Sequence, residues 1–106
     1  MAEVRLSSVA VEDLERMIVT HSLPADTKER VARSTRSLTR FPRIGRELEG
    51  RWRGFRFVLG PWRWMLIIYV YEQPGDLVLV VSVQDGRSAR GLGRVELMSA
   101  AAERGR

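Results

Sequence analysis

Three short tracts rich in β-branched and aromatic residues, all beyond residue 50, constrain the fold of this chain more than any other feature. Apolar side chains in these tracts alternate or run without interruption, which is typical of half-buried and fully buried strands. Strands are therefore expected over about 51–59, 62–71 and 77–83. Gly60 with Pro61, and the sequence EQPGD at 72–76, supply turn residues between them. An antiparallel sheet is the predicted centre of the fold.

Two helices and a short opening strand are expected before this sheet. Apolar residues recur at helical spacing at Val11, Leu14, Met17 and Ile18. Ser7 or Ser8 can cap this helix, which is expected to run through about His21. A second helix is expected from about Ala25 to Arg40, where the sequence FPRIG ends it. With a strand at 3–6, this order predicts an α+β fold in which two antiparallel helices pack on a three- to four-stranded, mostly antiparallel sheet.

The length of 106 residues and the hydrophobic content of 44% fit a single domain with one core. Residues 1–90 are expected to form this domain, and residues 91–106 a short helix or a flexible tail. The chain has no cysteine and His21 is its one histidine, so neither a metal site nor a cofactor is expected. The apolar tracts are too short to span a bilayer and no secretory signal opens the chain, so a cytoplasmic protein is expected.

The chain carries a formal charge of +5, and arginine supplies all but one of its basic residues. Between residues 40 and 63, seven arginines stand against two glutamates, an excess that equals the charge of the whole chain. A basic stripe of this kind indicates an anionic partner such as RNA, DNA or an acidic protein segment. The alternative is a solvated surface without a partner. The candidate nucleic-acid contacts are Arg51, Arg53, Arg56 and Arg63.

Placing the tip of the first hairpin at 60–61 fixes an expected register for its two strands. Phe57 then lies opposite Trp64, within a continuous apolar face that is expected to receive the two helices. The other face is expected to be an outer one that a partner can reach. It carries Arg56, Val58, Arg63 and Tyr69, with Val58 opposite Arg63. A bulge or an odd-length loop would move one strand to the opposite face.

The motifs resemble a known family. The order of expected elements, with LTRFPRIGRELEG leading into GFRFVLGPWRWMLIIY and then LVLVVSV, is similar to the RelE/ParE superfamily of bacterial toxins from type II toxin–antitoxin systems. The likeness spans roughly residues 3–88. The resemblance implies a RelE-like fold and a protein that is toxic when free. It also implies an antitoxin partner that holds the toxin inactive, in a hetero-oligomer of the two proteins.

The resemblance also implies candidate catalytic residues. Arg56 falls where ribosome-dependent nucleases of this family keep a basic residue, and Arg63 matches the arginine that contacts the scissile region. Arg87 is the candidate for a further family arginine, and no tyrosine follows it where the nuclease would have one. Cleavage of RNA by its own 2′-hydroxyl also needs a group that moves protons, which arginine cannot do near neutral pH. Tyr69, on the same expected face, is the candidate for that role.

Three functions therefore stay open on the sequence. The first is a toxin that acts on translation by binding messenger RNA or the ribosome, with or without cleavage as an endoribonuclease. The second is a toxin that poisons DNA gyrase through protein contact. The third is an inactive member that is kept as an antitoxin partner or a DNA-binding corepressor. A nucleic-acid-binding domain that is not a toxin is a further alternative, because a fold alone does not fix a function.

Overall fold

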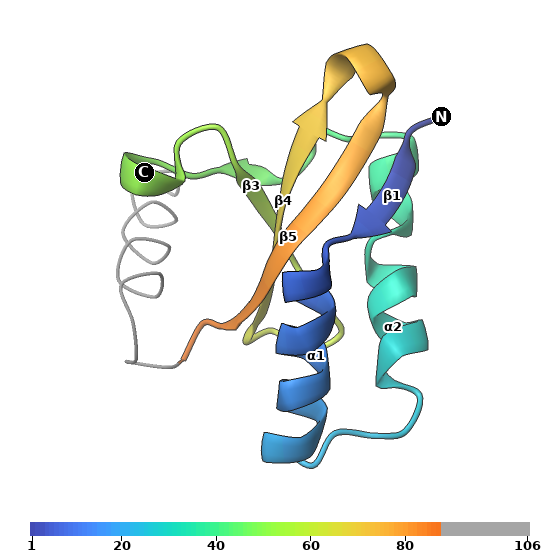
Figure 1. Ribbon diagram of the computed structural model, residues 1–106, viewed down its shortest axis with the longest axis vertical. Helices are drawn as coiled ribbons and strands as arrows, with labels where there is room; N and C mark the ends of the chain where they lie inside the picture. Colours follow the sequence, from blue (N-terminus) through green and yellow to red (C-terminus); the bar gives the residue numbers. More distant parts are fainter. Residues whose placement is uncertain (88–106) are drawn as a thin grey trace.

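The computed structural model describes residues 1–87, so the expected helix or tail at 91–106 lies outside the described residues. Its strands and α-helices are β1 (Glu3–Leu6), α1 (Ser8–Thr20), α2 (Thr27–Ser34), β2 (Arg46–Glu47), β3 (Arg56–Leu59), β4 (Met65–Glu72) and β5 (Leu77–Asp85). Short 3₁₀ helices occur at Arg36–Thr39, Gly50–Trp52 and Gln73–Gly75. Figure 1 shows α1 and α2 side by side, running in opposite directions next to the sheet. The predicted α+β class and the antiparallel helix pair are confirmed.

The strands form one sheet in the order β1-β5-β4-β3-β2. β1 pairs with β5 in parallel, whereas the other neighbouring strands are antiparallel. The sheet has five strands, rather than the three to four that were expected, because the opening strand and the two-residue β2 each join one edge. The strand expected at 51–59 begins at Arg56, since Gly50 and Gly54 have positive φ values of 68° and 94° and turn the chain before it.

The first helix begins where its sequence signal places it. The side chain of Ser7 accepts a hydrogen bond from the Ala10 N–H at 3.1 Å, which satisfies one of the free donors at the start of α1. Its buried face consists of Ala10, Leu14 and Met17. These residues share one side of the helix and pack on the sheet.

The second helix is shorter than predicted. The helix expected over 25–40 divides into α2 and the 3₁₀ helix at 36–39. The hydroxyl of Ser34 donates to the carbonyl of Arg30 at 3.1 Å, and that of Thr35 donates to the carbonyl of Ala32 at 3.0 Å. Such side chains compete for the carbonyl groups that an α-helix needs, which explains why the α-helix ends here.

The predicted hairpin register is wrong. In the structure Val58 faces Ile67 rather than Arg63, and Phe57 faces Ile68 rather than Trp64. The last paired residues of the hairpin are Leu59 and Leu66, so an even number of residues, 60–65, lies between them. A 2.8 Å hydrogen bond from the Gly60 N–H to the Met65 carbonyl closes this loop. The four-residue shift keeps side-chain parity, so Arg56 and Tyr69 still share a face, while Arg63 leaves the sheet for the loop.

The predicted assignment of the two sheet faces is also wrong. The helices cover the face that carries Val58, Met65, Ile67 and Tyr69. Phe57 belongs to a second, smaller cluster on the opposite face, with Leu48, Leu66 and Ile68. β4 is buried on both sides from Met65 to Tyr69, because the segment after β2 folds back over the second face. Alternation of side chains cannot identify the helix-covered face of such a strand.

Candidate functional site

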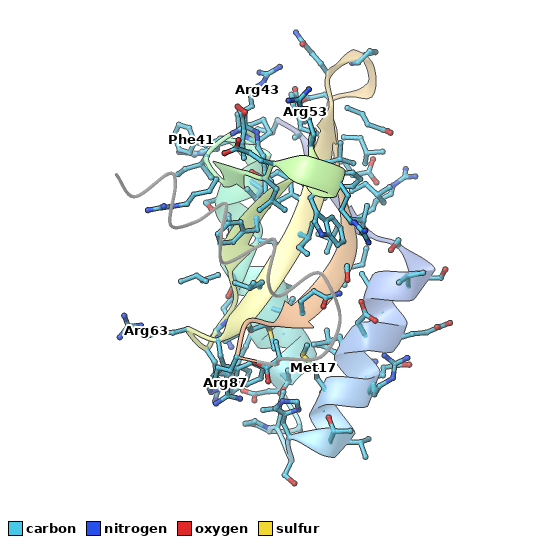
Figure 2. All side chains as sticks on the ribbon, turned by 90° about the vertical axis from the view of Figure 1, so that its left-hand side faces the viewer. Met17, Phe41, Arg43, Arg53, Arg63 and Arg87 are labelled. Carbon is cyan, nitrogen blue, oxygen red and sulfur yellow. The ribbon has the colours of Figure 1, made fainter. Side chains whose placement is uncertain are left out.

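The structure places the predicted site residues at two ends of the sheet. Figure 2 shows Arg43 and Arg53 at one end of the molecule and Arg63 and Arg87 at the other. The arginines of the sequence stripe therefore do not form one continuous surface. The predicted roles of Arg51 and Arg53 as nucleic-acid contacts stay predictions.

Arg56 lies directly opposite Tyr69 in the ladder of β3 and β4. Its guanidinium donates to the carbonyl of Arg43 at 3.0 Å and to that of Gly45 at 2.9 Å, and it pairs with the carboxylate of Glu47 at 3.2 Å. Its side chain is 23% exposed. The guanidinium thus fastens the chain before β2 to β3.

Tyr69 is fully buried, so it does not lie on an outer face. Its hydroxyl oxygen accepts a 2.9 Å hydrogen bond from the Gly45 N–H. Burial raises the pKa of this hydroxyl, against the smaller opposing effects of the Gly45 N–H and of Arg56. The phenol therefore stays protonated near neutral pH, and its position gives it a structural role.

The loop over 60–64 supplies aromatic rings and cations to the other end of the sheet. The rings of Trp62 and Trp64 stack at 6.0 Å, and the guanidinium of Arg30 lies 5.9 Å from the Trp62 ring. A 2.7 Å hydrogen bond from the Gly86 N–H to the Trp64 carbonyl joins this loop to the end of β5. Arg63 is exposed in this loop, and Figure 2 shows its side chain extending away from the ribbon.

His21 reaches the same end of the molecule from the connection between α1 and α2. Its ring stacks on Trp64 at 4.9 Å with an interplanar angle of 13°. Its Nε2 atom lies 2.9 Å from Oδ2 of Asp85, and its Nδ1 atom lies 2.9 Å from Oγ1 of Thr20. Arg87 completes the group, with its guanidinium carbon 4.5 Å from the Trp64 ring. We name this group the Trp64 cluster, consisting of Thr20, His21, Trp62, Trp64, Asp85 and Arg87.

Asp85 is the anionic centre of the Trp64 cluster, and its side chain is 15% exposed. Burial raises the pKa of Asp85, but hydrogen bonds from Arg87 and His21 outweigh this effect and hold the pKa at about 2. The carboxylate thus stays ionised at neutral pH and fixes both neighbouring side chains.

A pocket of about 550 Å³ lies beside the Trp64 cluster, between α1 and the end of β5. Its lining residues are Asp13, Arg16, Met17, Thr20, His21, Val83, Gln84, Asp85 and Arg87. Asp13 connects α1 to β5 beside this pocket. Its carboxylate accepts a hydrogen bond from the Ser82 hydroxyl at 2.8 Å and another from the Val83 N–H at 3.1 Å. The volume is typical of pockets that bind small molecules or single ligand groups.

Of the predicted catalytic residues, the structure therefore brings Arg63 and Arg87 to one end and leaves Arg56 and Tyr69 in the framework. Sequence reasoning missed His21 and Asp85 as a pair, since 64 positions separate them. The sequence did contain one signal. His21 is the one histidine of the chain, and it lies at the end of the first expected helix, outside the expected strands of the hairpin.

Within residues 1–87, no three His, Cys, Asp or Glu side chains are placed to hold a metal ion. The same residues contain no helix with the length and apolar character needed to cross a membrane. The chemistry that the Trp64 cluster offers consists of stacking on aromatic rings, pairing with anions and proton transfer at the imidazole.

The family follows from the sequence as a whole. A family model described as the ParE toxin of type II toxin–antitoxin system, parDE, matches residues 4–90. The chain belongs to this family. It is thus a type II toxin of the RelE/ParE superfamily, as its motifs indicated, and no curated protein matches this ParE-family toxin significantly in sequence.

Solved structures agree with the fold of this ParE-family toxin. The isolated RelE toxin of E. coli has a TM-score of 0.61 and 17% identity, covering 98% of each chain. The RelBE2 toxin–antitoxin complex from Mycobacterium tuberculosis gives a TM-score of 0.60 and 22% identity, over 79% of this chain and 96% of that one. The intact E. coli RelBE complex gives a TM-score of 0.61 and 15% identity, over 80% of this chain and 96% of that one. At these identities the likeness supports the RelE-like fold.

Proposed function

We propose that this toxin inhibits translation by binding RNA at the Trp64 cluster, and that a cognate antitoxin holds it inactive. The observation that carries the proposal is the grouping of stacked rings and arginines at one end of the sheet. His21, Trp64 and Trp62 form successive stacks, with ring centroids 4.9 and 6.0 Å apart. Aromatic side chains next to guanidinium groups are the usual means of holding unpaired bases and their phosphates.

The proposed antitoxin follows from the family and from charge. Two of the similar solved structures are complexes of a toxin with an antitoxin. The formal charge of +5 favours an acidic partner segment and would speed its association. An antitoxin that covers the Trp64 cluster would block RNA directly.

Expression of the toxin alone in bacteria, with protein synthesis and DNA synthesis labelled separately, tests this function. We expect protein synthesis to stop first and co-expression of the antitoxin to restore it. Arg63→Ala should weaken RNA binding and lower the slope of log affinity against log salt by about 0.7, the value for one lost phosphate contact on a single strand. Arg33→Ala, which removes an exposed guanidinium from the last turn of α2, is the matched control.

Poisoning of DNA gyrase is the second candidate function. The ParE family description favours it. The burial of Tyr69 and the hydrogen bonds of Arg56 to backbone carbonyls also favour it, because they engage two predicted nuclease residues within the fold. If DNA synthesis stops while protein synthesis continues, and gyrase-linked DNA breaks accumulate, gyrase is the target and the translation proposal is wrong.

A further inference from the structure

A chain of hydrogen bonds runs through the imidazole of His21. Oγ1 of Thr20 lies 2.9 Å from Nδ1, and Oδ2 of Asp85 lies 2.9 Å from Nε2. An ionised carboxylate can accept hydrogen bonds but not donate them, so Nε2 carries the proton in this pair. In the neutral ring, Nδ1 is therefore the acceptor, and the Thr20 hydroxyl donates to it.

The acceptor Nδ1 lies where a substrate hydroxyl can replace that of Thr20. Thr20 is exposed at the end of α1, and both Thr20 and His21 line the 550 Å³ pocket. The side chain of His21 is 28% exposed, whereas that of Asp85 is 15% exposed. One ring nitrogen is thus paired with a carboxylate, and the other is bound only to an exposed hydroxyl that lines the pocket. This arrangement is typical of a general base with an orienting carboxylate.

The same pocket can hold a phosphate. Arg87 and Arg16 line it, with side chains that are 61% and 67% exposed. The Arg16 contact with Asp13 is long, at 3.5 Å, so this guanidinium can turn toward an anion at little cost. Guanidinium groups stabilise the charge that develops on a phosphorane.

We propose that His21 is the general base of an RNA-cleaving site in this pocket and that Asp85 is its positioning residue. The inference rests on the proposed function, since it makes RNA the substrate of the Trp64 cluster. It also replaces Tyr69 as the group that moves the proton.

In the proposed step, Nδ1 of His21 takes the proton of a ribose 2′-hydroxyl. The 2′ oxygen then forms a bond to the adjacent phosphorus, and the bond from phosphorus to the 5′ oxygen breaks. The 5′ oxygen keeps that electron pair and takes a proton from water, and the resulting hydroxide recovers the proton from His21. The products are a 2′,3′-cyclic phosphate and a 5′-hydroxyl. Arg16 and Arg87 offset the charge of the phosphorane.

The test uses the full chain and a 5′-labelled messenger RNA on bacterial ribosomes. We expect the wild-type protein to cut the message and leave a 2′,3′-cyclic phosphate end. His21→Gln should lower the cleavage rate about 10²- to 10⁴-fold, the usual contribution of a general base, while RNA binding persists. Arg33→Ala should cleave like the wild type. Free imidazole should restore part of the rate to His21→Ala.

Two measurements on the wild-type protein keep the inference testable if the His21 variants do not fold. A message with a 2′-deoxynucleotide at the cleaved position should bind and stay intact. The cleavage rate should also rise with pH, since a general base acts in its unprotonated form. Asp85→Glu, which keeps a carboxylate, should cleave faster than Asp85→Asn, while both variants bind RNA. The charged groups that line the pocket with His21 are Asp13, Arg16, Asp85 and Arg87.

The outcomes separate the inference from the function on which it rests. If translation stops while the message stays intact, His21 is not a general base for RNA, and the translation proposal survives. If His21→Gln cuts as fast as the wild type, another group is the base. If neither translation nor the message is affected by folded protein, the proposed function itself is wrong.

Discussion

The hydroxyl of Tyr69 lies 2.9 Å from the backbone nitrogen of Gly45 and accepts its hydrogen bond in the interior of the protein. This contact joins the middle of β4 to the chain that precedes β2. It explains why a tyrosine occupies a fully buried position where a phenylalanine of the same shape would otherwise serve.

Tyr69→Phe should therefore lower stability rather than activity. The substitution leaves the Gly45 N–H without an acceptor, which costs about 1–3 kcal/mol for a buried donor. Urea unfolding measures the loss, and growth arrest by the folded variant should match the wild type. Tyr71→Phe is the control, because the Tyr71 hydroxyl donates to Asp76 at the exposed surface and its loss should cost less. A stable Tyr69→Phe protein without toxicity would contradict this assignment.

Gly45→Ala should destabilise the protein through close approach. A Cβ atom at this position would lie 2.6 Å from the Tyr69 hydroxyl and 2.7 Å from the Phe57 carbonyl oxygen. Relief of such contacts requires backbone shifts that typically cost about 1–3 kcal/mol. The matched control is Gly75→Ala, where the nearest heavy atom is Cβ of Leu77 at 4.0 Å. Equal thermal midpoints for the two variants would show that the chain over Tyr69 is loosely packed.

Arg56→Lys should lower stability and leave RNA affinity unchanged. A lysine keeps the charge but cannot donate in a fixed fork to Arg43, Gly45 and Glu47 together. We expect a loss of about 1 kcal/mol, comparable with one net hydrogen bond. Unfolding and RNA-binding assays on the same preparation check both parts. A large fall in RNA affinity would instead support the predicted role of Arg56 as a nucleic-acid contact.

The Asp85 carboxylate should make stability depend on pH in the acidic range. Its pKa in the folded protein is about 2, below the ordinary value of 3.8, so the ionised form stabilises the folded state. That contribution is complete above the ordinary pKa and is lost as pH falls toward the folded value. The stability gap between the wild type and Asp85→Asn should thus narrow from about pH 4 to pH 2. A gap that stays constant over this range would mean that the carboxylate charge contributes nothing.

The sequence predicts those parts of the fold that local signals determine. The Ser7 cap marks the start of α1, and the tracts of β4 and β5 lie where their apolar residues place them. The order of motifs also identifies the superfamily. These features depend on neighbours in the chain, so they can be read without knowledge of the tertiary structure.

The sequence could not predict the sheet faces or the Trp64 cluster. β4 is apolar on both sides, so only the path of the segment that carries Leu48 decides what covers each face. His21 and Asp85 meet because the end of α1 lies next to the end of β5, a relation that no local pattern encodes. The register of the hairpin depends on a loop that is longer than the tip at 60–61 on which the predicted register was based.

The parallel pairing of β1 with β5 sets the order in which a nascent chain can acquire its structure. Val4 has Val78 as its partner in the sheet, and the Ser7 hydroxyl reaches the carbonyl of Val81, 74 positions later. Contacts this distant in sequence can form only after nearly the whole domain has left the ribosome. The contact of His21 in the Trp64 cluster can likewise form only after Asp85 has been synthesised. A partly synthesised toxin that ends before Asp85 therefore lacks the Trp64 cluster.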